Sequence, residues 1–225
     1  MLKKRFTETA LAVCLAMSAG AAQAVNVVPN GTFESGLDGW LQFPNGGTIG
    51  LAAENGPSAP GSQSAQLVAD TTVASPSFPI IKVERLAAGL LTNGAPVTVS
   101  FDARAPIQTV DSTQGDQLGK VVFIAELFSE FTGDGATNEI LLAPPVFLDV
   151  NWNTYTFNTT LGADASGGVS LLFKADCGAA PNCALTALID NVVIDTATVP
   201  VPAAVWLFGS GLLGLVGVAR KKKAA

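Results

Sequence analysis

Carboxylates and thiols are the reactive side chains of this sequence, because its 225 residues include no histidine. The absence of histidine excludes Ser-His-Asp and Cys-His nucleophilic catalysis and any histidine-ligated metal. A glycoside hydrolase needs two carboxylates at a fixed separation. All 18 acidic residues except Glu8 lie between residues 25 and 199, where so many acids form accidental pairs and no pair stands out. We therefore expect that the protein is not an enzyme.

Cys177 and Cys183 lie near the end of the acidic part of the chain, whereas Cys14 lies in a segment that we expect to be removed. An even number of cysteines in an exported chain favours a disulfide between the two. Closing so short a loop would stabilise the fold by roughly 2 kcal/mol in the chain-entropy model. A zinc site would need ligands that the chain lacks, and the spacing is not that of a Cys-x-x-Cys redox motif.

The charge of the chain is separated by sign. Residues 25–199 hold 5 basic and 17 acidic side chains, a net charge of 5 − 17 = −12, while residues 1–24 and 200–225 are basic. An acidic body is a poor partner for nucleic acid, because phosphate contacts require clustered lysine and arginine. The two basic ends adjoin apolar segments, so they are better explained as targeting signals.

The first 24 residues have the organisation of a secretory signal peptide. Lys3-Lys4-Arg5 is the positive region, residues 10–19 form a short apolar region, and Ala22-Gln23-Ala24 is a small-x-small cleavage pattern. We expect residues 1–24 to be removed on export, so that the mature chain begins at Val25.

The C-terminal tail, residues 197–225, has three parts. Val199-Pro200-Val201-Pro202 is a stiff, extended break, because proline disfavours helix at itself and at the residue before it. Residues 203–219 carry no charge and would span roughly 25 Å as a helix, a marginal crossing of the bilayer core. Arg220-Lys221-Lys222-Lys223 follows, and the positive-inside rule places this end in the cytoplasm and the body outside.

This tail resembles the PEP-CTERM sorting signals of bacterial surface proteins, in which a short proline motif precedes an apolar helix and a basic cluster. The sequence departs from the pattern at Val201, where the family has glutamate, which leaves the subclass of sorting enzyme open. The resemblance implies an inner-membrane-anchored precursor that an exosortase cleaves near Val199-Pro200-Val201-Pro202. It further implies delivery to the envelope, surface or extracellular matrix of a Gram-negative bacterium.

Residues 25–196 are predicted to form one all-β domain, long enough to bury a substantial core. Apolar and polar residues alternate in 97–104, 154–158 and 169–174, as is typical of strands with one solvated face. Many short strands without a helical stretch favour an antiparallel sandwich. Further strands are expected at 64–68, 75–83, 119–128, 145–150 and 184–195, and long surface loops at 105–118 and 129–139.

The body also resembles CenC-like carbohydrate-binding modules, which are jelly-roll sandwiches with a galactose-binding-like fold. The segment NGTFESGLDGW at residues 30–40 looks like the opening of such a module. Shorter matches follow at residues 61–67, 97–104, 152–155 and 189–192. The resemblance implies an antiparallel jelly-roll β-sandwich. It does not by itself imply a sugar site, because many domains share this framework and bind no sugar.

The same resemblance suggests a structural calcium site in which an early acidic residue meets a late strand aspartate. The matching residues here are Glu34 and Asp190, with backbone carbonyls near Asn30 and Gly31 as further ligands. Carboxylate and carbonyl oxygens are what Ca²⁺ prefers, and they need no histidine. The alternative is that Glu34 caps a turn and Asp190 hydrogen-bonds that turn.

Sugar rings stack on exposed aromatic side chains, so the aromatic residues of the body are candidates for ligand contact. Trp40 and Trp152 occupy motif positions that usually face the core, and Tyr155 lies on the side of its strand that we expect to be buried. We therefore interpret these three as packing residues and consider Phe128 and Phe131 better candidates for exposure. No ligand-binding residue is assigned on this basis.

The sequence thus favours an exported, sorted surface or matrix protein that associates non-catalytically with polysaccharide. One alternative is a structural or adhesive surface protein with no sugar site, and a more remote one is a hydrolase that acts on glycosides. The exosortase, the membrane and an extracellular polysaccharide are the expected partners, and calcium is the expected cofactor if there is one.

Overall fold

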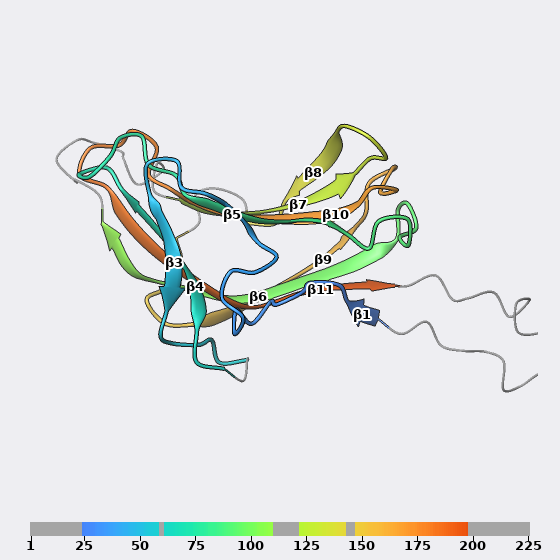
Figure 1. The fold of residues 1–225 in the computed structure, drawn as a ribbon, viewed down its shortest axis with the longest axis horizontal. Helices are drawn as coiled ribbons and strands as arrows, with labels where there is room; N and C mark the ends of the chain where they lie inside the picture. The colour runs from blue at the N-terminus through green and yellow to red at the C-terminus, as the bar shows by residue number, and fades with distance from the viewer. Residues whose placement is uncertain (1–23, 59–60, 110–121, 143–146, 198–225) are drawn as a thin grey trace, which may run out of the picture. The chain divides into compact units, whose positions relative to one another are not determined.

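The computed structural model describes residues 24–197, except residues 59–60, 110–121 and 143–146. The described residues contain eleven strands and no helix, and the strands form two antiparallel sheets, which we call sheet A and sheet B. In Figure 1 the strands β5, β7, β8 and β10 form the upper layer, and β6, β9 and β11 form the lower layer. The prediction of an all-β body is confirmed.

Sheet A contains the two longest strands of the fold. Its order is β3-β4-β11-β6-β9, and β1 pairs with the C-terminal end of β11. The strands are β1 (Ala24–Asn26), β3 (Thr48–Ala52), β4 (Ser64–Asp70), β6 (Pro96–Thr109), β9 (Asn153–Thr160) and β11 (Ala184–Ala197). Both β6 and β11 have strand neighbours on both sides, and their core-facing residues, such as Phe101 and Ile189, are fully buried.

Sheet B has five strands in the order β2-β5-β10-β7-β8. They are β2 (Leu41–Phe43), β5 (Ile80–Leu86), β7 (Val122–Glu130), β8 (Ala136–Ile140) and β10 (Gly168–Asp176). The central pair, β10 and β7, is in register over nine positions, from Gly168 opposite Glu130 to Asp176 opposite Val122.

An aromatic cluster joins the two sheets. Phe101 of β6 meets Phe173 of β10 edge to face at 4.8 Å between ring centroids, and Phe123 of β7 lies 5.9 Å from Phe173. All three side chains are fully buried. The N-terminal segment closes one side of this core, because Trp40 packs between Phe33 and Phe173. The burial of large aromatic surface is the main stabilising contribution here.

Most of the predicted strands are present, but four predictions at their boundaries were wrong. Residues 105–118 do not begin as a loop, because β6 continues to Thr109. Residues 75–79 are not part of β5, since Pro76 and Pro79 have no N–H to donate to a ladder. Residues 147–150 form no strand, because Asn151 donates its backbone N–H to Asp149 Oδ1 at 2.8 Å and turns the chain there.

The predicted surface loop at 129–139 was wrong for a different reason. The strand β7 runs to Glu130, and β8 occupies Ala136–Ile140. Every residue of β8 is exposed, so the strand lacks the alternation of buried and solvated residues from which strands are recognised. The short strands β2 and β3 were not predicted for the same reason, as they lie at sheet edges and none of their residues is buried.

Candidate functional site

Glu34 is one of the two predicted metal-binding carboxylates, and it holds the chain just before β4. Its Oε1 accepts the backbone N–H groups of Ser62 at 2.9 Å and Gln63 at 3.0 Å, and its Oε2 accepts the Ser62 hydroxyl at 3.3 Å. These hydrogen bonds, that of the Ser62 N–H first, hold the pKa of Glu34 below its ordinary value. Both oxygens of this carboxylate therefore already have donors.

Asp190 of β11 lies directly opposite Asp102 of β6, and both side chains are fully buried. Asp190 accepts the N–H groups of Gly56 and Asn191, each at 2.7 Å. Asp102 accepts the N–H of Ser58 at 2.9 Å, as well as hydroxyl groups of Ser58 and Thr154. Burial raises the pKa of Asp190, and the nearby charges of Asp102 and Glu34 act in the same direction.

Together the three carboxylates hold four described residues of the connection between β3 and β4 by their N–H groups, namely Gly56, Ser58, Ser62 and Gln63. In the described part of the chain, no group of three or more acidic or cysteine side chains converges in the way metal ligands do. The carbonyl of Gly31 accepts the Val192 N–H at 2.9 Å, and that of Asn30 accepts from Phe33. Ca²⁺ prefers six to eight oxygens, and the oxygens named here accept hydrogen bonds from N–H donors. The calcium site at Glu34 and Asp190 stays a prediction.

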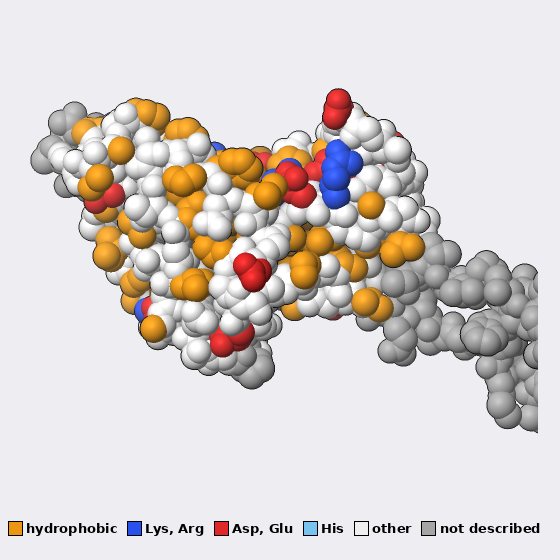
Figure 2. Space-filling view, viewed as in Figure 1, with side chains coloured by type: hydrophobic (Ala, Val, Ile, Leu, Met, Phe, Trp, Pro, Cys, Tyr) orange, Lys and Arg blue, Asp and Glu red, His pale blue; other side chains and the backbone are white. Residues whose placement is uncertain are grey.

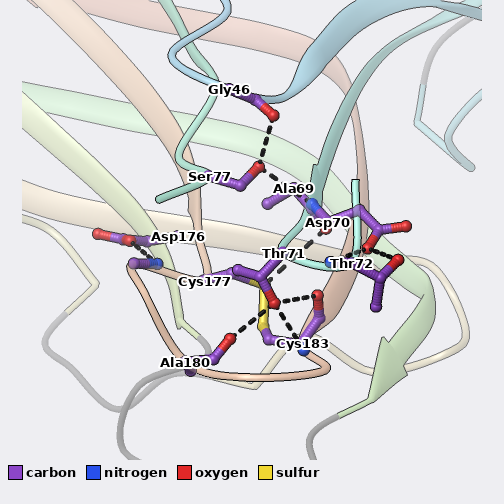
Figure 3. The surroundings of a disulfide bond; sticks show 11 residues. Gly46, Ala69, Asp70, Thr71, Thr72, Ser77, Asp176, Cys177, Ala180 and Cys183 are labelled. Atoms are coloured by element: carbon purple, nitrogen blue, oxygen red, sulfur yellow. Dashed lines mark hydrogen bonds between the residues drawn. A yellow bond between two sulfur atoms is a disulfide. The ribbon is translucent and has the colours of Figure 1, made fainter. Parts of the chain in front are cut away.

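A disulfide joins Cys177 and Cys183, both fully buried, across the turn between β10 and β11 (Figure 3). Thr71 holds this turn against the end of β4. Its hydroxyl donates to the Ala180 carbonyl at 2.6 Å and accepts the Cys183 N–H at 2.9 Å. A second hydrogen bond, from the Cys177 N–H to the Ser77 carbonyl at 3.0 Å, attaches the turn to the segment before β5. The cluster is structural, because its polar atoms are used within the fold.

The outer face of sheet B presents apolar and charged side chains next to each other. Its side chains alternate along the central strands with core residues, and they lie opposite one another in register across neighbouring strands. We use "outer face" for the following set: Leu41 and Phe43 on β2, Ile80, Lys82 and Glu84 on β5, Leu172 and Lys174 on β10, Ile124, Glu126 and Phe128 on β7, and Ile140 on β8. Figure 1 shows the ribbon of this sheet dipping between two raised ends, and Figure 2 shows acidic, basic and hydrophobic side chains gathered there.

Lys82 is the centre of the charged groups on the outer face. Its ammonium lies 2.9 Å from Glu84, 3.5 Å from Glu130 and 4.9 Å from the centroid of the Phe128 ring. Lys174 pairs with Asp176 at 2.8 Å. Both lysines are therefore neutralised within the protein. If Glu130 and Asp176, which contact these lysines, are counted with Glu84 and Glu126, four acidic groups stand against two basic ones.

The exposure of the aromatic side chains agrees with the prediction only in part. Trp40 is 4% exposed, in the core, and Tyr155 is half-buried and stacks on Phe101 at 5.5 Å between centroids. Phe128 and Phe131 are half-buried and so less exposed than we expected. Phe43, at 43% exposed, was missed. The sequence does contain a local signal for a strand here, because the apolar residues Leu41 and Phe43 flank the polar Gln42 immediately after Trp40.

A cavity of about 250 Å³ opens where β8 approaches the end of β9. Its walls come from Ser129 and Leu127 of β7, from Thr137, Asn138 and Glu139 of β8, and from Thr160, Leu161 and Gly162. The Gly162 N–H donates to Ser129 Oγ at 2.8 Å, and the Thr159 hydroxyl donates to Glu139. Hydroxyl, amide and carboxylate groups of this kind form hydrogen bonds with hydroxyl-rich ligands.

The predicted sorting residues, from Val199 to Pro202 and from Arg220 to Lys223, lie outside the described residues, as does the apolar segment 203–219. Among residues 24–197, where described, no helix is long and apolar enough to span a bilayer. The sequence of residues 198–222 matches the model of the PEP-CTERM protein-sorting motif. No curated protein matches the chain.

Several solved structures share the fold. One is the enzymatically active domain of bacteriophage CBA120 tailspike protein 4, with a TM-score of 0.55 and 13% identity over 76% of this chain and 21% of that chain. Another is the CBM22-1 xylan-binding domain from Paenibacillus barcinonensis Xyn10C, with a TM-score of 0.50 and 15% identity over 80% of this chain and 100% of that chain. The chain thus spans only about a fifth of the tailspike chain.

These comparisons define the class of the protein. It is a two-sheet antiparallel β-protein whose structural neighbours include carbohydrate-binding modules with a β-sandwich fold. In addition, the chain carries a PEP-CTERM sorting motif at residues 198–222. At identities of 13–15% the structural likeness shows the fold alone.

Proposed function

We propose that this protein is an exported, exosortase-sorted component of the cell envelope or extracellular matrix that associates non-catalytically with polysaccharide. The observation that carries the proposal is the outer face of sheet B, where exposed Leu41 and Phe43 lie beside β5, with Leu41 opposite Lys82. Further along the same face, Leu172 of β10 lies opposite Glu126 of β7. Sugars present both apolar C–H faces and hydroxyls, and such a surface offers partners for both. The sorting motif supports a location where polysaccharide is abundant.

The proposed route to the surface has three steps. A signal peptide at residues 1–24 starts export, and a membrane helix at 203–219 with its basic stop at Arg220–Lys223 retains the precursor in the inner membrane. An exosortase then cleaves near Val199–Pro202 and releases the body, residues 25–196, to the envelope of a Gram-negative bacterium. We further propose that this body is a jelly-roll sandwich, since the order of sheets A and B is that of an antiparallel two-layer fold.

The charges of the outer face favour a neutral glycan over an anionic one. Lys82 and Lys174, the only basic residues of this face as defined above, are already paired with Glu84 and Asp176. A uronic acid or sulfated sugar would therefore meet uncompensated carboxylates such as Glu126. The cavity beside Glu139, which is also acidic, has the same preference.

The arrangement of acids supports a non-catalytic role. Asp102 and Asp190 lie side by side, as a catalytic pair would, but both are fully buried and accept hydrogen bonds from residues 56 and 58. A substrate could not reach them without displacing that segment. A structural or adhesive surface protein without a sugar site is the alternative to polysaccharide binding.

A glycan array probed with the purified mature protein tests the proposal. We expect retention on neutral polysaccharides and none on polyuronates at the same ionic strength. Absence of binding to every polysaccharide would exclude polysaccharide association and leave the structural or adhesive alternative. Preferential binding of polyuronates would contradict the charge argument made for the outer face.

A further inference from the structure

The strand β9, Asn153–Thr160, forms one edge of sheet A. It pairs with β6 at eight consecutive positions, from Pro96 opposite Thr160 to Ala103 opposite Asn153, with no bulge. Within the described ranges, no strand pairs with its other side. An eight-residue edge therefore presents backbone N–H and C=O groups in a regular row.

Edge strands are normally protected by charge, proline, bulges or shortness. The sequence of β9, NTYTFNTT, contains neither a charged residue nor a proline. The other described edges differ, because β1 and β2 have three residues each, β8 carries Glu139, and β3 has five residues with a glycine at its centre. The edge of β9 is thus long and lacks these protecting features.

The side chains on the exposed face of β9 are also uncharged. Thr154, Thr156 and Asn158 are exposed, and they adjoin Thr98 and Ser100 on the neighbouring strand β6. Residues 25–199 carry a net charge of 5 − 17 = −12, so two copies of this body repel each other over most of their surface. The side chains of β9 add no charge to that repulsion, which favours a second copy of the same chain as the occupant of this edge.

We propose that two copies associate through β9 in an antiparallel, two-fold symmetric pair centred on Thr156. Residues directly opposite each other in antiparallel strands lie on the same face of the sheet. In a symmetric pair of identical strands, the two-fold axis is therefore level with a residue and not with the midpoint between two residues. Centring on Thr156 places Tyr155 opposite Phe157 of the second copy. Both rings are half-buried and stack on Phe101, and cross-strand aromatic pairs stabilise a sheet. Sheet A then continues from one copy into the other.

A charge at the symmetry centre tests this association. In the Thr156→Lys variant two ammonium groups face each other across the pair, and like charges directly opposite destabilise it. The matched control is Thr98→Lys, which adds the same charge to the same face, one strand away from the edge. The full chain, purified in detergent, would be measured by light scattering after size exclusion, with circular dichroism to confirm that each variant folds.

We expect the wild type and Thr98→Lys to form dimers, and Thr156→Lys to have a dimer dissociation constant about tenfold or more higher. Because all three chains share the same tail, association through the tail would not distinguish them. The proposal is overturned if the wild type is monomeric, or if Thr156→Lys dimerises as well as the control does.

Cysteine cross-linking tests the register independently. A Thr156→Cys chain brings two thiols opposite each other and should form a disulfide-linked dimer on a non-reducing gel. In Thr98→Cys the two thiols are three strand spacings apart across the sheet and four residues apart along it, roughly 20 Å in all, beyond the reach of a disulfide. Equal cross-linking of the two variants, or none of Thr156→Cys, would refute the pairing centred on Thr156.

Discussion

Glu34, Asp102 and Asp190 use their carboxylate oxygens to accept backbone N–H groups from one segment, residues 56–63. A carboxylate that accepts backbone N–H groups is stabilised in its charged form. Glu34 shows this most clearly, since the pKa of its side chain is lowered by the bonds to Ser62 and Gln63. These acids therefore determine how the connection between β3 and β4 lies on sheet A.

The Glu34→Gln variant should unfold at a lower temperature than the wild type at pH 7, because the amide accepts these hydrogen bonds more weakly than the carboxylate does. The folded pKa of Glu34 is depressed, so its contribution is complete above the unfolded value of about 4.3 and is lost as the pH falls through the folded pKa. The difference in unfolding temperature between wild type and variant should thus shrink on acidification. Thermal melts between pH 7 and pH 3 measure it.

The same thermal melts distinguish the predicted calcium site from the alternative in which Glu34 caps a turn. If Glu34 and Asp190 ligate Ca²⁺, a chelator lowers the unfolding temperature of the wild type at neutral pH and leaves Glu34→Gln unchanged. The hydrogen bonds described above predict no effect of the chelator on either chain. Asp190 cannot account for acid lability, because its pKa is raised and its protonation on acidification favours the folded state.

At the scale of strands, the turn between β10 and β11 depends on Cys177 and Cys183. Replacing both with serine should lower the free energy of unfolding by about 2 kcal/mol, because the open turn gains entropy in the unfolded chain. Denaturant unfolding checks the magnitude, and non-reducing mass spectrometry of the wild type checks the bond itself. Free thiols at both positions would refute the disulfide and the predicted oxidising compartment.

The strands that could be predicted from the sequence are those with one buried face. In β6 apolar and polar residues alternate from Val97 to Arg104, and the strand covers these residues and continues to Thr109. The strand β11 covers the apolar-rich stretch 184–195, where a strand was expected. Short edge strands such as β2 and β8 have no such pattern, as their side chains are exposed on both faces. The carboxylate contacts could not be predicted either, because Asp190 meets Gly56 across 134 residues, a separation at which no local pattern gives a signal.

In the molecule as a whole, the folded body and the sorting motif occupy different parts of the chain. The β-sandwich of residues 24–197 determines which groups lie on the outer face of sheet B, and the motif at 198–222 concerns sorting. The proposed polysaccharide contact and the proposed pairing through β9 involve different sheets. A chain associated through sheet A would leave the outer face of sheet B open to ligand.

The affinity of a Phe43→Ala variant for neutral polysaccharide tests the central claim most directly. Phe43 is 43% exposed on sheet B, and Leu51 on sheet A, at 39%, provides the matched control, Leu51→Ala. Losing partial burial of the ring against ligand should cost about 1 kcal/mol, or roughly fivefold in dissociation constant. Affinity electrophoresis through gels containing xylan, galactomannan or hydroxyethyl cellulose provides the measurement. We predict weaker retardation of Phe43→Ala and unchanged retardation of Leu51→Ala. Equal retardation of the two variants and the wild type would contradict binding at this face.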